Sequence, residues 1–121
     1  MPADYRIDAS ERIVYCRAWG VLTNHDLETH RAALYADPAF RPDLAQLYDF
    51  TAVTKLEITA DALRNLAETT RFSPTARRAL VASTDLAFGM ARMYSLMTQF
   101  EFVEVFRDEA SAMRWLRSAT A

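Results

Sequence analysis

The chain has 121 residues, of which 51% are hydrophobic and 25% are charged. This composition excludes a disordered chain, and the length allows a core to form without a metal or a disulfide. The only two glycines, Gly20 and Gly89, exclude a glycine-rich phosphate loop, and a single cysteine, Cys16, excludes an internal disulfide. A formal net charge of −2 argues against a surface that binds nucleic acid.

No targeting or membrane segment is expected in this sequence. The N-terminal residues carry no cationic stretch, and no window reaches the roughly 18 apolar residues that a membrane span needs. We therefore expect a cytoplasmic protein without a membrane span, folded as a single domain over residues 1–121.

The chain alternates strand-like and helix-like segments. In chain order, the pattern predicts strands at 5–8 and 12–19, a helix at 24–36, a strand at 44–50, a helix at 60–70, a strand at 78–83, a helix at 85–100, a strand at 102–106 and a helix at 109–117.

Residues typical of element boundaries separate these segments. Gly20 is expected to end the second strand, and Thr23 with Asp26 forms a capping-box pattern at the start of the first helix. Residues 51–58 are predicted to be a loop, after which Thr59 caps the second helix.

The order β-β-α-β-α-β-α-β-α is typical of an α/β fold. Strands that alternate with helices are joined by right-handed crossovers and run parallel. We therefore expect four mostly parallel strands, with the first strand antiparallel at one edge of the sheet.

The predicted strands are apolar on both sides. In residues 12–19 a small-residue face alternates with a bulky face that carries Tyr15 and Trp19, and residues 102–106 are also mostly apolar on both faces. Both faces of the sheet should therefore be shielded from water. Helices, a partner chain or an apolar ligand are the three alternatives for covering the bulky face.

The histidines and the cysteine are interpreted as structural. His25 and His30 are five residues apart on one helix, which places them about 140° apart and excludes chelation of one metal by both. Asp26 and His30 are spaced for a surface pair. Cys16 stands among apolar neighbours, where a thiol usually behaves as a small hydrophobic group.

Polar residues gather where the predicted parallel strands end, which is where α/β sheets bind ligands. These residues are Asp49, Thr51, Ser83, Thr84, Asp85 and Asp108. Asp49 with Asp85 or Asp108 would suit Mg²⁺, but we favour helix capping for Thr84 and Asp108. Asp49, Thr51 and residues 83–85 are kept as candidate ligand- or partner-binding residues, and no catalytic residue, metal or cofactor is expected.

The long predicted helix carries three methionines on one stripe, Met90, Met93 and Met97. Core packing is the favoured interpretation, and an adaptable apolar pocket or interface is the alternative. Arg92 lies off this stripe, where it would contact a ligand headgroup or solvent.

Four short runs of sequence carry a family resemblance that extends over nearly the whole chain. They are residues 79–94 (ALVASTDLAFGMARMY), residues 105–110 (VFRDEA) with Trp115-Leu116, residues 20–23 (GVLT) and residues 47–49 (LYD). The chain resembles small bacterial STAS-like proteins, which are similar to the sporulation anti-sigma-factor antagonist and are grouped with CRAL-TRIO lipid-binding domains.

This resemblance implies a β-α superhelix with a sequentially ordered sheet. For the anti-sigma-factor antagonists it also implies a kinase-type protein partner and a switch by phosphorylation of a serine that follows an aspartate. Here Asp49 is followed by Phe50 and Thr51, so Thr51 is the candidate phosphoacceptor, and no glycine follows before Gly89.

We therefore expect a non-enzymatic STAS-like regulatory or protein-interaction domain that forms a homodimer. The alternative is a carrier or sensor of a small apolar, lipid-like ligand, bound by Tyr15, Trp19 and the three methionines. A third alternative is metal-assisted chemistry at the ends of the strands.

Overall fold

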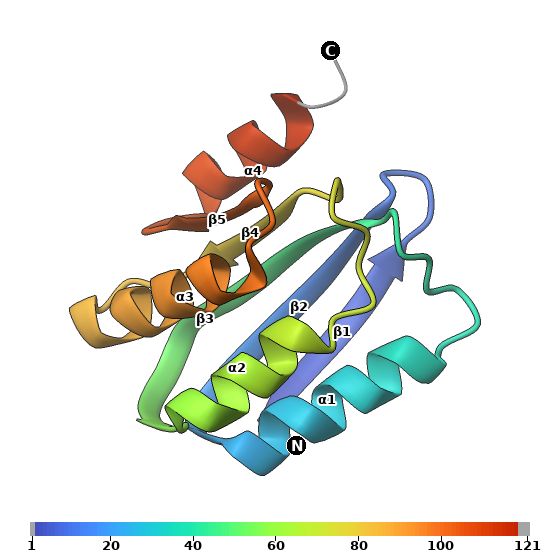
Figure 1. The fold of residues 1–121 in the computed structure, drawn as a ribbon. Coiled ribbons are helices and arrows are strands. Elements are labelled where there is room, and N and C mark those ends of the chain that lie inside the picture. The colour runs from blue at the N-terminus through green and yellow to red at the C-terminus, as the bar shows by residue number, and fades with distance from the viewer. Residues whose placement is uncertain (1, 119–121) are drawn as a thin grey trace.

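The computed structural model describes residues 2–118, which form strands and helices in the predicted order (Figure 1). The elements are β1 (Ala3–Asp8), β2 (Ile13–Thr23), α1 (Asn24–Ala36), β3 (Ala45–Glu57), α2 (Ala60–Glu68), β4 (Arg78–Val81), α3 (Asp85–Thr98), β5 (Val103–Phe106) and α4 (Glu109–Ser118). The sheet has the order β1-β2-β3-β4-β5, with β1 antiparallel to β2 and every other pair parallel. The predicted α/β topology is confirmed.

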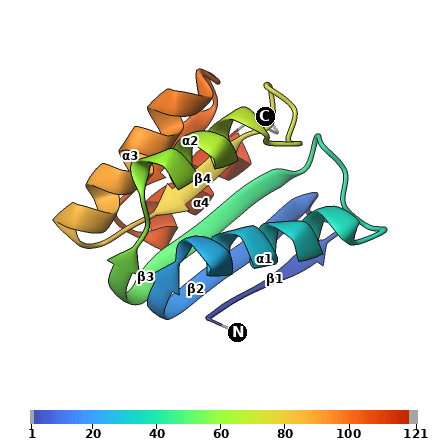
Figure 2. The same ribbon diagram turned by 60° about the horizontal axis from the view of Figure 1, so that its bottom comes forward.

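The helices form two unequal layers on the sheet. Helices α1, α2 and α3 cover one face, which we call the front face, and α4 packs on the opposite, back face (Figures 1 and 2). Each crossover is right-handed and leads to the next strand in the same direction along the sheet. Every crossover helix therefore lies on the same face of the sheet. Only α4, which follows the last strand, is free to cover the back face.

Strands β2 and β3 extend further than the sequence suggests. Gly20 does not end β2, because it adopts the left-handed conformation (φ 65°) next to a register shift and the strand continues to Thr23. The predicted loop at residues 51–58 is also wrong, since β3 continues to Glu57 with Leu56 opposite Leu22. The two extensions pair with each other, so each satisfies the backbone hydrogen bonds of the other. Polar side chains do not prevent this pairing, because backbone groups make it.

The predicted capping residues do occupy the starts of the helices. The Asp26 backbone N–H donates to Thr23 Oγ1 (3.2 Å), and the Thr23 N–H donates to the Asp26 carboxylate (2.9 Å), which completes the capping box. The hydrogen bond from the Thr23 backbone lowers the pKa of Asp26. Thr59 and Thr84 cap α2 and α3 by accepting the backbone N–H of Ala62 and Ala87, respectively.

The back-face layer is a small second core under α4. Leu116 and Ala112 of α4 pack with Leu47, Ala79 and Val81 of the sheet, all of them buried. A hydrogen bond from the Arg77 guanidinium to the Trp115 carbonyl oxygen (2.9 Å) also joins α4 to the segment before β4.

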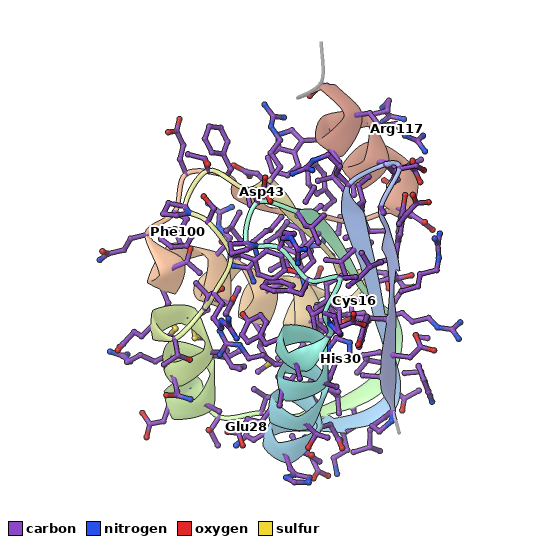
Figure 3. All side chains as sticks on the ribbon, turned by 90° about the vertical axis from the view of Figure 1, so that its right-hand side faces the viewer. Cys16, Glu28, His30, Asp43, Phe100 and Arg117 are labelled. Atoms are coloured by element: carbon purple, nitrogen blue, oxygen red, sulfur yellow. The ribbon has the colours of Figure 1, made fainter. Side chains whose placement is uncertain are left out.

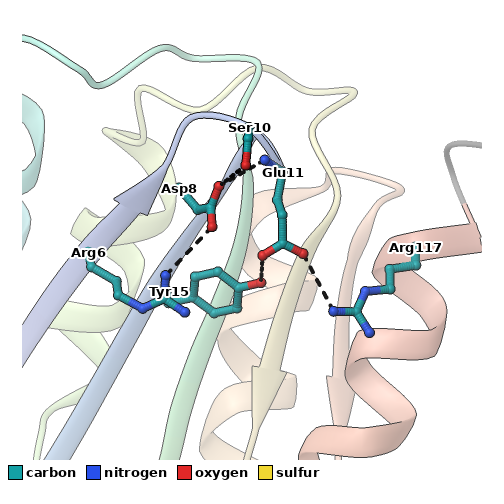
Figure 4. A network of polar contacts seen from close by, with 6 residues as sticks. All are labelled: Arg6, Asp8, Ser10, Glu11, Tyr15 and Arg117. Atoms are coloured by element: carbon teal, nitrogen blue, oxygen red, sulfur yellow. Dashed lines mark hydrogen bonds and ion pairs between the residues drawn. The ribbon is translucent and has the colours of Figure 1, made fainter.

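Among residues 2–118, no helix lies on the back face of β1 and β2 (Figure 3). The Arg6 guanidinium lies 4.2 Å from the Tyr15 ring centroid, and the Tyr15 hydroxyl donates to Glu11, which also pairs with Arg117 of α4 (Figure 4). Trp19 is 36% exposed. The expected shielding of both faces by other elements therefore holds for β3 to β5, whereas the side chain of Arg6 lies over Tyr15.

Candidate functional site

A cavity of about 110 Å³ lies between the front face of the sheet and helices α1, α2 and α3. Its walls are largely apolar and come from the sheet and the three helices that cover its front face. They include Leu34 from α1, Leu66 from α2, Ala91 and Met90 from α3, and Leu80 from β4. An apolar cavity somewhat larger than this one, of about 150 Å³, holds a benzene molecule. The cavity is therefore large enough for a small organic molecule.

The unexpected extension of β3 builds part of the cavity wall. Leu56, near the end of this strand, and Ile58, just before α2, both line the cavity and are half-buried. Asn24 and Thr59 tie the starts of α1 and α2 together, since Asn24 Nδ2 donates to Thr59 Oγ1 (3.2 Å) and the Thr59 N–H donates to Asn24 Oδ1 (3.0 Å). This end of the cavity is consequently held by two strand-to-helix junctions.

Arg78 is the most unusual residue in the cavity wall. It is only 5% exposed, and its guanidinium donates to Gln46 Oε1 (3.0 Å), Tyr94 OH (2.7 Å) and Thr70 Oγ1 (3.4 Å). All three acceptors are neutral. Buried charges in proteins are usually paired with an opposite charge, because the loss of hydration is otherwise large.

His30 and Tyr48 form a neutral polar pair beside the cavity. His30 Nε2 lies 3.1 Å from the Asp4 carbonyl oxygen, which only accepts, so Nε2 carries the proton and Nδ1 accepts from Tyr48 OH (3.2 Å). Burial lowers the pKa of His30 and raises that of Tyr48, which keeps both groups uncharged near neutral pH.

Cys16 lies in the layer between α1 and the sheet, close to His30 (Figure 3). Its Sγ accepts a hydrogen bond from Gln46 Nε2 at 3.4 Å, and burial raises the pKa of the thiol to about 12. The thiolate is the nucleophilic form of cysteine, so this thiol is inert near neutral pH.

A second arginine lines the cavity from α1. Arg31 donates to the Leu66 carbonyl oxygen (2.7 Å), to Thr69 Oγ1 (2.8 Å) and to Tyr35 OH (3.1 Å). The lining therefore contains two guanidinium groups and one neutral histidine, and it includes no aspartate or glutamate. The cavity is apolar with a positive electrostatic bias.

The polar residues predicted at the strand ends take part in local contacts. Asp49 lies inside the extended β3, and its carboxylate accepts a hydrogen bond from the backbone N–H of Thr51 (2.8 Å). Thr51 itself is exposed. Asp85 pairs with Arg107 at 2.9 Å, and Arg107 also donates to the carbonyl oxygen of Ser83. Across residues 2–118, no three histidine, cysteine, aspartate or glutamate side chains are placed to hold a metal ion.

The predicted apolar residues are divided between different surfaces. Met90 lines the cavity, whereas Met93 is 40% exposed and neither it nor Met97 contributes to the lining. Tyr15 and Trp19 lie on the back face, on the other side of the sheet from the cavity. Arg92 is exposed on α3.

Sequence reasoning missed Gln46 and Arg78, the polar pair at the centre of this site. Arginine and glutamine usually lie on the surface, so each was counted only as part of a strand. A signal was present in the alternation, because Gln46 shares a strand face with Tyr48, and Arg78 shares one with Leu80. Two polar residues at paired positions of neighbouring strands, on a face that is otherwise apolar, indicate a buried polar site.

The topology and the helix layers define a SpoIIAA-like, or STAS-like, fold. A similar solved structure is that of an uncharacterised protein of the DUF3478 family, with a SpoIIAA-like fold, from Shewanella loihica PV-4. The two share 23% sequence identity with a TM-score of 0.63, over 94% of this chain and 93% of that one. The predicted STAS-like resemblance is thus confirmed for the fold.

No protein-family model and no curated protein matches this chain. Within residues 2–118, the helices lack the combination of length and hydropathy that crossing a bilayer requires.

Proposed function

We propose that this protein binds a small apolar molecule in the cavity between its sheet and helices α1 to α3. The observation that carries the proposal is a cavity of about 110 Å³ with apolar walls and a few polar groups, among them Arg78 and Tyr48. Ligand sites in proteins typically combine an apolar lining with a few polar groups that orient the ligand. The proposal assigns a carrier or sensor role and no catalytic step.

The size of the cavity limits the ligand and its affinity. By comparison with the cavity of about 150 Å³ that holds benzene, this volume encloses about four to five non-hydrogen atoms, so a longer chain extends through the open side of the cavity. Because very small ligands gain at most about 1.5 kcal/mol per atom, and usually much less, a dissociation constant in the micromolar to millimolar range is expected. Hexanol and hexanoate are suitable probes.

The change Ala91→Leu is expected to abolish binding of both probes. Ala91 is 9% exposed and lines the cavity, so a larger side chain at this position occupies the space that the ligand needs. Titration of ¹⁵N-labelled protein, followed by NMR, would measure binding to the wild type and to this variant.

The matched control is Arg92→Leu, which adds a leucine at the next, exposed position of α3. This variant should bind both probes as the wild type does. Failure of the wild type to bind either probe at millimolar concentration would contradict the proposed function. Loss of binding in the control would assign the contact to Arg92 instead.

A second proposed function is homodimerisation or protein interaction through the outer side of α3. Leu86 and Leu96 are each 67% exposed and Met93 is 40% exposed. At 100° per residue these side chains lie within about 80° of one another, so they form one apolar stripe. Exposed apolar stripes of this kind are typical of interaction surfaces.

The double change Leu86→Glu with Leu96→Glu tests this surface. The wild type is expected to sediment as a dimer at high concentration and the variant as a monomer, because two facing acidic groups repel each other. The substitutions Ala32→Glu and Ala39→Glu, at exposed positions in and after α1, add the same two negative charges outside the stripe and should leave the dimer intact. A wild type that stays monomeric at high concentration would overturn the proposed dimer.

A further inference from the structure

We infer that the ligand of the front-face cavity is an anion, a small carboxylate with an apolar chain, and that Arg78 binds its carboxylate group. This inference rests on the proposed function, since it names the class of molecule that the cavity takes. The apolar walls would receive the chain, and the guanidinium would receive the charge.

The first argument is the missing countercharge of Arg78. Arg78 as a whole residue is 5% exposed, and the partners of its guanidinium in residues 2–118 are an amide, a phenol and a threonine hydroxyl. A guanidinium has five N–H donors, and these three hydrogen bonds occupy three of them. Two donors and a full positive charge are thus available to a ligand in the cavity that Arg78 lines.

The second argument is that Arg78 is already fixed in position. Its guanidinium lies 4.5 Å from the Phe72 ring centroid and 5.5 Å from that of Tyr94, and Gln46 holds its Nε. Aromatic faces stabilise the cation partly, but they do not replace a countercharge. A planar guanidinium held on three sides loses little conformational freedom when a planar carboxylate binds it.

The third argument is the charge of the remaining wall. Arg31 adds a second half-buried guanidinium, and the lining contains no acidic side chain to neutralise either group. His30, which burial keeps neutral, neither competes for the anion nor repels a cation. A cationic ligand would face two guanidinium groups at short range, and a neutral ligand would leave Arg78 without a countercharge.

The test compares three probes that have the same six-carbon chain: hexanoate, hexanol and hexylammonium. Wild-type protein should bind hexanoate about 10- to 100-fold more tightly than hexanol, which is the usual gain from a hydrogen-bonded charge, and should not bind hexylammonium. Arg78→Gln should remove this preference for hexanoate while hexanol binding changes by less than about threefold. Arg78→Lys, which keeps the charge but not the planar fork, should retain part of the preference.

The wild-type comparison needs no variant, so it decides the inference even if Arg78→Gln fails to fold. Equal binding of hexanoate and hexanol would overturn the anion inference and leave the proposed function standing. Absence of binding by all three probes would overturn the proposed function itself. Preferential binding of hexylammonium would contradict the charge argument directly.

Discussion

Replacing Leu34 by alanine is expected to lower the free energy of unfolding by about 3 kcal/mol and to let the cavity accept a longer carboxylate. Leu34 is 1% exposed in the front core and also lines the cavity. Removing its isopropyl group takes away buried apolar contacts and leaves a larger void beside the existing one. Urea unfolding, with and without octanoate, measures both effects.

The comparison with Leu116→Ala makes this result specific. Leu116 is also a helical leucine and is 4% exposed, but it packs on the back face, away from the cavity. Octanoate should raise the free energy of unfolding of Leu34→Ala more than that of Leu116→Ala, because a ligand stabilises only the state that binds it. Equal effects on the two variants would place the carboxylate outside the cavity.

Leu116→Ala is the second change with a large expected effect, again a loss of about 3 kcal/mol in the free energy of unfolding. Leu116 and Ala112 form the contact of α4 with β3 and β4, and α4 is the only helix on the back face among residues 2–118. Without this leucine the buried strand residues Ala79 and Val81 lose their main cover.

The matched control for this change is Arg114→Ala. It is also a truncation to alanine within α4, at an exposed residue, so the loss should stay below about 0.5 kcal/mol. A loss below about 1 kcal/mol for Leu116→Ala would mean that α4 contributes little to the fold. It would also mean that the back face of the sheet tolerates water.

Much of the fold was predictable because local signals and global topology agree. The capping residues Thr23, Thr59 and Thr84 mark the starts of α1, α2 and α3, and each accepts the expected backbone hydrogen bond. Alternation of strands and helices then determines a parallel sheet with right-handed crossovers. The sequential strand order was implied by the STAS-like resemblance, because alternation alone also fits other orders of parallel strands.

The extensions of β2 and β3 were not predictable for a physical reason. Gly20 is typical of a turn, residues 51–55 mix polar and apolar side chains, and nothing local indicates that the two segments pair with each other. Strand propensity depends on the partner strand more than on the residues themselves. Here the partner lies about 30 residues away in sequence, with Trp19 opposite Ala52.

The site was harder to predict than the fold. In α/β sheets, ligands usually bind at the carboxyl ends of the strands, which is where the sequence places Asp49 and Asp85. In the structure, Asp49 lies within β3 and Asp85 pairs with Arg107. The cavity instead depends on how three helices pack over the sheet, and no sequence pattern reports the volume that they leave. Burial of Arg78 is a result of that packing.

The most direct test of the account is the position of a bound probe. In an isotope-filtered NOE spectrum of ¹³C-labelled protein with saturating hexanoate, we predict cross-peaks from the hexanoate chain to the methyl groups of Leu66, Leu80 and Ala91, which line the cavity. Cross-peaks to the exposed methyl groups of Leu86 and Leu96 instead would contradict the account, because the molecule would then lie on the outer side of α3.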